Sequence, residues 1–106
     1  MLSIVDTHQH LWDMAQFSLP WLASDGVEPL RKDHLMGDYL AAAEGANVAK
    51  TVYMEVDVIP EQRVEEAEFV IGLCESDDYP MAGAVLSGNP GDENFRQYMG
   101  RFKDNS

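Results

Sequence analysis

Three short apolar runs alternate with three longer stretches of helical periodicity, and this alternation most strongly constrains the fold of the chain. Short runs rich in β-branched and apolar residues are typical of buried strands, and apolar residues three and four positions apart are typical of helices. Strands that alternate with helices form parallel sheets with right-handed crossovers. The sequence therefore predicts an α/β fold. Its expected elements are a strand beginning at Ile4, a helix over His34–Glu44, a strand over Val48–Val58, a helix from Pro60 to just before Ser76, a strand over Met81–Ser87 and a helix from Asp92 to Phe102.

The first predicted strand lies within Ile4–Asp13 and ends in two histidines one residue apart. Because successive side chains on a strand point to opposite faces, Asp6, His8 and His10 are expected to share one face. The two histidines would lie about 6.5 Å apart along the strand, which lets both imidazoles reach one ion. Three such groups are costly to bury without partners. The pattern therefore predicts a metal or catalytic site, with satisfied core histidines as the alternative.

The segment Val5–Asp13, with the sequence VDTHQHLWD, resembles the first-strand signature of the amidohydrolase superfamily. It is most similar to the amidohydrolase 2 branch, which holds L-fuconolactonases, L-rhamnonolactonases and 2-pyrone-4,6-dicarboxylate lactonase. Gln9 and the pair Trp12-Asp13 favour these lactonases over the decarboxylases of the branch. The resemblance implies a TIM-type (β/α)8 barrel, which needs about 250 residues. Residues 1–106 would therefore be the N-terminal part of a single metal-dependent-hydrolase-like barrel domain, with three strand–helix units and the barrel incomplete.

The same resemblance implies the chemistry. His8 and His10 would be catalytic and would hold a divalent metal, zinc above others, for hydrolysis of a sugar-derived or related carboxylate lactone. Some lactonases of this branch work without a metal, so a metal-independent role, with both histidines binding the carbonyl or a substrate carboxylate directly, stays open. Further histidines and an aspartate on strand eight of the family are not found in this sequence. The chain alone is therefore expected to be inactive.

Substrate-binding roles are predicted for three side chains near strand ends. The long segment Leu11–Lys32 carries Trp12 and Trp21 and follows the first strand, so it is expected to form a lid or pocket wall. The alternative is that the tryptophans only pack this segment down. Glu55 lies near the end of the second strand, where a carboxylate that faces a pocket is expected to contact substrate. Asp57 is a weaker candidate for the same role.

Other polar side chains are assigned structural roles. His34 lies at the start of the first helix, away from strand ends, and is expected to pack. Cys74 lies on an apolar helical stripe and is expected to be core. Asp33 and Asp92 are expected to cap the first and third helices. The acidic run of the second helix is expected to be a solvated face, comprising Glu61, Glu65, Glu66 and Glu68.

Composition excludes some classes of partner. The chain has 106 residues and a formal net charge of −12, with 19 acidic residues against 7 basic ones. Nucleic acids and anionic membranes are bound through lysine and arginine, so neither is expected as a partner. No apolar run approaches the roughly 20 residues of a membrane span, and no signal-peptide pattern is found. A single cysteine fits a reducing compartment, and a cytoplasmic location is expected.

Two other functions stay open. TatD-like and PHP-like phosphoesterases also begin with Asp-x-His-x-His, although the aromatic loop and the few basic residues argue against them. The chain could instead be an inactive half-barrel that binds a partner. Three parallel strands leave sheet edges open, so the remainder of the barrel or self-association is expected in addition to a small-molecule substrate, and the chain is not expected to be a stable monomer.

Overall fold

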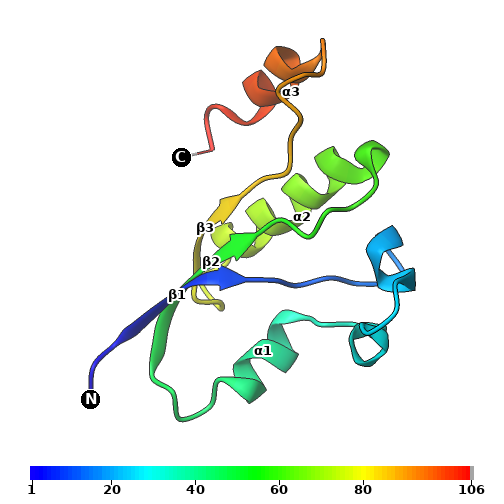
Figure 1. Ribbon diagram of the computed structural model, residues 1–106. Helices are drawn as coiled ribbons and strands as arrows, with labels where there is room; N and C mark the ends of the chain where they lie inside the picture. Colours follow the sequence, from blue (N-terminus) through cyan, green and yellow to red (C-terminus); the bar gives the residue numbers. More distant parts are fainter. Residues whose placement is uncertain (106) are drawn as a thin grey trace.

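The computed structural model describes residues 1–105, which form a three-stranded parallel sheet with flanking helices (Figure 1). The strands are β1 (Ile4–Gln9), β2 (Val48–Met54) and β3 (Met81–Val85). Their order in the sheet is the order in the sequence, β1-β2-β3, and both pairings are parallel. The predicted α/β class and the parallel sheet are confirmed.

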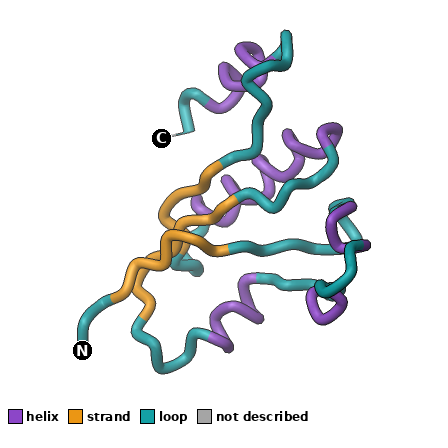
Figure 2. The backbone as a smooth tube through the Cα atoms, viewed as in Figure 1, coloured by secondary structure: helices purple, strands orange, loops and turns teal. Residues whose placement is uncertain are grey.

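The helices fill the connections as expected. They are α1 (Met36–Ala42), α2 (Arg63–Glu75) and α3 (Phe95–Phe102), with short 3-10 turns η1 (Pro20–Ala23), η2 (Glu28–Leu30) and η3 (Pro60–Gln62). Because the strands are parallel, the loops that follow them leave from the same end of the sheet, as the tube in Figure 2 shows. None of the helices within residues 1–105 has the length and apolar character needed to span a bilayer.

Several element boundaries differ from the prediction. The first helix begins at Met36 because Asp33 does not cap it: the Asp33 carboxylate accepts a 2.9 Å hydrogen bond from the backbone N of Met14. Asp38 instead accepts from the backbone N of Leu35, at 2.9 Å. The second strand ends at Met54, and a φ of 56° at Asp57 shows that the chain has left the extended conformation before Val58.

The third helix is also shifted. Asn94, not Asp92, directly precedes α3. The Asp92 carboxylate accepts a 2.9 Å hydrogen bond from the backbone N of Asn94, so it stabilises the turn before the helix. This helix adds little to the core: no described residue of α3 is buried, and Met99 is 52% exposed.

The core sits under the segment that follows β1. This segment buries five apolar side chains, and Phe17 packs edge-on against Phe69 of α2 with ring centroids 5.6 Å apart. The sheet and α2 supply most of the rest. The buried cluster consists of Leu11, Trp12, Phe17, Leu19, Leu22, Met36, Tyr53, Val56, Val58, Val70 and Met81.

The two outer strands are more exposed than predicted. Val5 on β1 is 54% exposed and Val85 on β3 is 46% exposed, so the expectation that these apolar runs form buried strands is wrong for part of β1 and of β3 within residues 1–105. The radius of gyration is 14.8 Å, whereas a compact domain of this length has about 13 Å. The described residues therefore form a flat, open layer whose outer strands lack cover.

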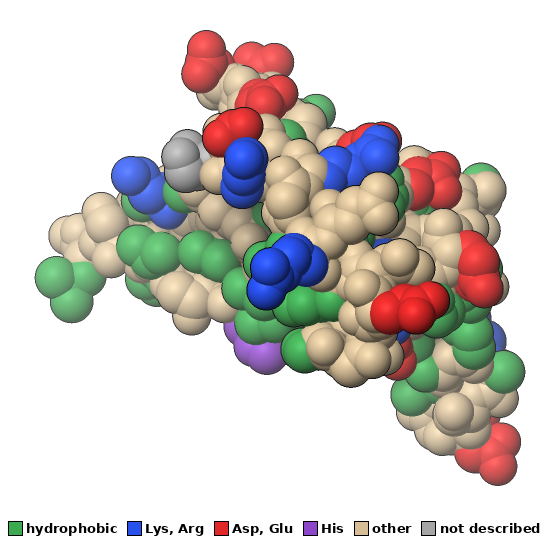
Figure 3. Space-filling model, turned by 90° about the horizontal axis from the view of Figure 1, so that it is seen from above, with side chains coloured by type: hydrophobic (Ala, Val, Ile, Leu, Met, Phe, Trp, Pro, Cys, Tyr) green, Lys and Arg blue, Asp and Glu red, His purple; other side chains and the backbone are tan. Residues whose placement is uncertain are grey.

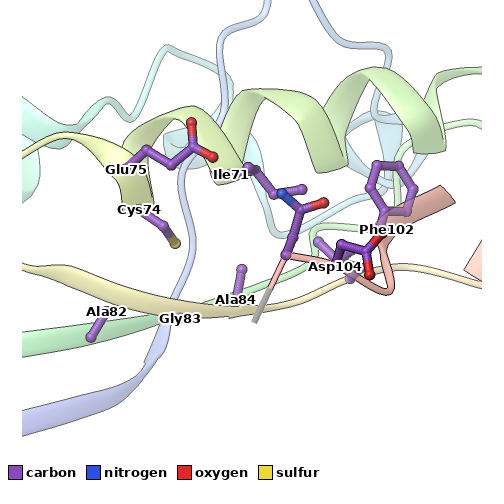
Figure 4. Close-up of a pocket in the computed structure, with 10 residues that line it drawn as sticks. Ile71, Cys74, Glu75, Ala82, Gly83, Ala84, Phe102 and Asp104 are labelled. Atoms are coloured by element: carbon purple, nitrogen blue, oxygen red, sulfur yellow. The ribbon is translucent and has the colours of Figure 1, made fainter.

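An open groove lies beside β3 (Figure 4). Its volume is about 530 Å3, and α2, β3 and the segment after α3 line it, with Ile71, Cys74, Ala84 and Phe102 among the apolar contributors. Burial raises the pKa of the Cys74 thiol. A thiol with a raised pKa is a poor nucleophile, which agrees with a packing role for Cys74.

The backbone conformation of the turn after α1 can be tested by substitution of Gly45. Gly45 has a φ of 84°, and open space surrounds the position of an added Cβ. Gly45→Ala should therefore destabilise the chain by about 1–2 kcal/mol through backbone strain alone. Gly72→Ala, inside α2 and equally open, is the matched control and should stabilise by about 0.5–1 kcal/mol. Urea unfolding measures both, and equal stability of the two variants would contradict the assigned turn.

Candidate functional site

The structure brings the two histidines of the first strand together. The ring centroids of His8 and His10 are 4.8 Å apart, with an angle of 76° between the ring planes. Both residues are exposed, and histidine atoms reach the surface beside hydrophobic side chains in Figure 3. The pair is therefore open to solvent or to a ligand.

The pairing of β1 with β2 fixes the His10 ring. Nδ1 of His10 lies 2.9 Å from the carbonyl oxygen of Met54, the last residue of β2. A carbonyl can only accept, so Nδ1 must carry the proton, and the lone pair of a neutral ring is left on Nε2. Histidines that bind metals commonly donate their second ring N–H in this way.

Asp6 is held by α1. Its carboxylate accepts hydrogen bonds from the Tyr39 hydroxyl, at 2.7 Å, and from the backbone N of His8, at 3.1 Å, and these bonds lower the pKa of Asp6. Gln9 also reaches α1, where its Nε2 lies 3.7 Å from the sulfur of Met36. The β1–β2 register shifts between Asp6 and Gln9. The strict alternation predicted for this strand is therefore interrupted between Asp6 and Gln9, whereas His8 and His10 stay together on the exposed side of the buried Gln9.

A cavity of about 480 Å3 lies at the carboxyl ends of β1 and β2. It gathers His10, both tryptophans of the long loop and the acidic residues that follow β2. Its lining consists of His10, Trp12, Trp21, Leu30, His34, Glu55, Val56 and Asp57. The structure therefore places four of the five predicted site residues on one cavity, while His8 lies next to it through its contact with His10.

The two tryptophans form a corner of this cavity. Their rings lie edge to face, with centroids 5.5 Å apart and an interplanar angle of 88°. Trp12 Nε1 donates to the carbonyl of Lys32 at 2.8 Å, and Trp21 Nε1 donates to the carbonyl of Val56 at 2.7 Å. Because both indole N–H groups are already bonded, the rings can offer a ligand only their apolar surfaces.

The acidic residues lie past the end of β2, not within the strand as predicted. Glu55 accepts a 2.7 Å hydrogen bond from the backbone N of Asp57, whose φ of 56° turns the chain sharply. Both residues line the cavity, and no lysine or arginine is among the lining residues. The cavity therefore has an acidic wall.

His34 is a lining residue that the sequence analysis placed elsewhere. It pairs with Trp12 in an antiparallel bridge, with N···O distances of 2.8 and 2.9 Å, and its ring lies 4.6 Å from the Trp12 ring. Its Nε2 is buried and has no hydrogen-bond partner within the described chain. The expectation that His34 lies away from the strand ends is wrong, because the bridge with Trp12 brings His34 to the segment that follows β1. The sequence did not reveal this, because a pairing between residues far apart in the chain leaves no local pattern.

Glu66 corrects the prediction of a solvated acidic face. It is only 2% exposed, and its Oε2 accepts from the Tyr53 hydroxyl at 2.7 Å and from the backbone N of Val56 at 3.1 Å. Desolvation by burial raises its pKa. One feature of the sequence indicated this burial: Glu66 lies four positions before Val70, the most buried residue of α2, and residues four apart share a helix face.

The donors fit a metal only in part. Two imidazoles are suitable zinc ligands, and the bond from His10 to Met54 leaves Nε2 of that ring for a metal. Within residues 1–105, no group of three or more histidine, cysteine or acidic side chains is arranged to hold an ion. Within the described residues, His8 and His10 are therefore a pair of donors without a complete ligand set.

A solved structure and a sequence relative resemble this chain. The fold is similar to the solved structure of an amidohydrolase 2 from Bifidobacterium longum subsp. infantis, with a TM-score of 0.67 and 27% identity over 84% of this chain and 34% of that one. The sequence is 33% identical over 87 residues to the uncharacterized protein y4mH of Sinorhizobium fredii (strain NBRC 101917 / NGR234), covering 74% of this chain and 29% of that protein. No family model matches the chain.

The chain thus spans about a third of the length of the relatives it matches. The structural similarity supports a relationship to the amidohydrolase superfamily. The positions of the histidine pair and the cavity, at the carboxyl ends of parallel strands, agree with where such folds place their sites.

The Tyr39–Asp6 bond gives a pH-dependent prediction. Because the folded-state pKa of Asp6 is lowered, the bond stabilises the fold above the ordinary aspartate pKa and loses its effect as the pH falls below about 3.9. Tyr39→Phe should cost about 1 kcal/mol at neutral pH and less in acid. Urea unfolding across this pH range tests it, with Tyr79→Phe as the control because Tyr79 is 39% exposed. A loss that did not depend on pH would contradict the assignment.

Proposed function

We propose that this chain supplies the histidine pair and one pocket wall of an amidohydrolase-type hydrolase that opens a lactone, and that it is the N-terminal part of the barrel domain of that enzyme. The observation that carries the proposal is the shared cavity of His10, Trp12, Trp21 and Glu55. The similarity to an amidohydrolase 2 structure supports it. On this proposal, the chain alone is inactive.

His8 and His10 are the proposed catalytic pair. A divalent ion held by both, zinc above others, would supply Lewis-acid activation of the lactone carbonyl and of water. The Met54 carbonyl keeps Nδ1 of His10 protonated and so presents Nε2 to the reacting centre. If the enzyme works without a metal, the same two imidazoles, in their protonated form, would donate N–H hydrogen bonds to the carbonyl oxygen of the lactone.

The cavity charge favours a sugar-derived lactone over a carboxylate-bearing one. Glu55 and Asp57 line the cavity without a basic partner. A substrate carboxylate about 6 Å from one of them would be repelled by about 3 kcal/mol at an effective dielectric constant of 20. An uncharged ring avoids this cost: its C–H face can pack on Trp21, and its hydroxyls can donate to Glu55.

The alternative functions have weaker support. A phosphoesterase needs cationic groups at the phosphate, and no lysine or arginine of residues 1–105 lines this cavity. Support for an inactive partner-binding role comes from the exposure of the outer strands and from the groove beside β3. Those features are equally expected if the remainder of a barrel, or a second copy, covers them. A cytoplasmic location stays a prediction.

Hydrolysis assays on the full-length protein that contains this sequence test the proposal. Neutral aldonolactones should be hydrolysed, whereas dicarboxylate lactones and phosphodiesters should not. His10→Ala should lower kcat/KM by about 100-fold or more, and Glu55→Ala should mainly raise KM. Glu61→Gln, an exposed change at the start of the second helical segment, is the control and should have no effect. Undiminished activity of the His10 variant would exclude the proposed site.

A further inference from the structure

We infer that Glu66 and Gln62 are positioning residues for the cavity lined by Trp12 and Trp21. They hold the segment that follows β1 and the segment that follows β2, which form two walls of this cavity, in fixed positions relative to each other. Neither residue lines the cavity. They lie four positions apart at the start of the second helical segment, so they share a face. Each binds a different segment of the cavity wall through its side chain.

Glu66 holds the wall that follows β2. One carboxylate oxygen, Oε2, accepts both the Tyr53 hydroxyl and the backbone N of Val56. The carbonyl of the same Val56 accepts the indole N–H of Trp21 at 2.7 Å. Val56 thus donates its backbone N–H to Glu66 and accepts the Trp21 indole N–H at its carbonyl. By fixing the Val56 backbone, the Glu66 carboxylate fixes the position of the carbonyl to which the Trp21 indole is bonded.

Gln62 holds the wall that follows β1. Its Oε1 accepts from the backbone N of Ser18 at 2.7 Å, and its Nε2 donates to the carbonyl of Gln16 at 3.2 Å. Ser18 also accepts, through its carbonyl, from the backbone N of Ile59 at 3.2 Å. These bonds fix the loop just before Pro20, where the turn that carries Trp21 begins.

Stability alone does not account for a carboxyl group at position 66. Burying an ionisable group is costly, and an apolar side chain of similar volume at such a site is often neutral or stabilising. The two hydrogen-bond donors to Glu66, the Tyr53 hydroxyl and the backbone N of Val56, carry no charge, and Glu55 and Asp57 act on it as like charges. The two hydrogen bonds that Glu66 accepts, from the Tyr53 hydroxyl and the Val56 backbone N, therefore explain why a carboxyl group is buried at this position.

The shared acceptor makes a sharp test. In Glu66→Gln the amide oxygen can take the place of Oε2 and accept both bonds, so the wall should be unchanged. Glu66→Leu removes the acceptor, and Glu66→Asp shortens the side chain so that it cannot reach both donors. Both should free the Val56 peptide and release Trp21.

The readout is the indole N–H signal of Trp21 in nitrogen-15 NMR spectra of the full-length protein that contains this sequence. In Glu66→Gln the chemical shift should be retained. In Glu66→Leu and Glu66→Asp it should move, and hydrogen exchange should rise about tenfold, the size expected for loss of one hydrogen bond. The hydrogen exchange of the Trp12 indole N–H, bonded to Lys32, serves as the internal reference; the Trp12 chemical shift does not, because the Trp12 ring contacts the Trp21 ring.

A destabilised control separates positioning from stability. Gly45→Ala should weaken the fold without touching the cavity, so its Trp21 signal should match that of the original chain. The inference is overturned if Gly45→Ala moves the Trp21 signal as far as Glu66→Leu does, or if Glu66→Asp leaves the signal unchanged. If the leucine variant does not fold, the aspartate and glutamine variants decide the question.

Discussion

The hydrogen bond between Nδ1 of His10 and the carbonyl of Met54 joins the end of β1 to the end of β2, and the site depends on it. Parallel pairing brings the carboxyl ends of the two strands side by side, so residues 44 positions apart become neighbours. The bond fixes the tautomer of His10 and leaves its second nitrogen, Nε2, outside this contact. The cavity with Trp12, Trp21 and Glu55 forms beyond this point.

The long segment after β1 acts both as core and as site. Its apolar side chains are buried, and its two indole N–H groups are bonded to backbone carbonyls, so the rings are held rigidly. The alternatives of packing and pocket wall are therefore not exclusive for Trp12 and Trp21. Under the proposed function, the aromatic corner beside Glu55 and Asp57 would take a ring with an apolar face and hydroxyl groups in preference to an anion.

The sequence predicted the elements well because each has a local signal. Strand–helix alternation and the histidine pair are local patterns, and the cavity residues His10, Trp12, Trp21 and Glu55 follow from their places at strand ends. The structure departs from the prediction where distant groups decide. Asp33 bonds to Met14 instead of capping α1, His34 pairs with Trp12, and Glu66 is buried under Tyr53. No local periodicity encodes such contacts, although the face shared by Glu66 and Val70 gave a partial signal. The exposure of the outer strands depends on what surrounds the sheet.

The most direct test of the account is whether the histidine pair and the aromatic corner bind one ligand together. Histidine and indole NMR signals can be followed in the full-length protein that contains this sequence while a neutral aldonolactone is added. The account predicts that His10, Trp12 and Trp21 shift in parallel with a single affinity, and that a dicarboxylate lactone at the same concentration leaves them in place. Shifts of the tryptophans without His10, or an equal response to the dicarboxylate, would contradict it.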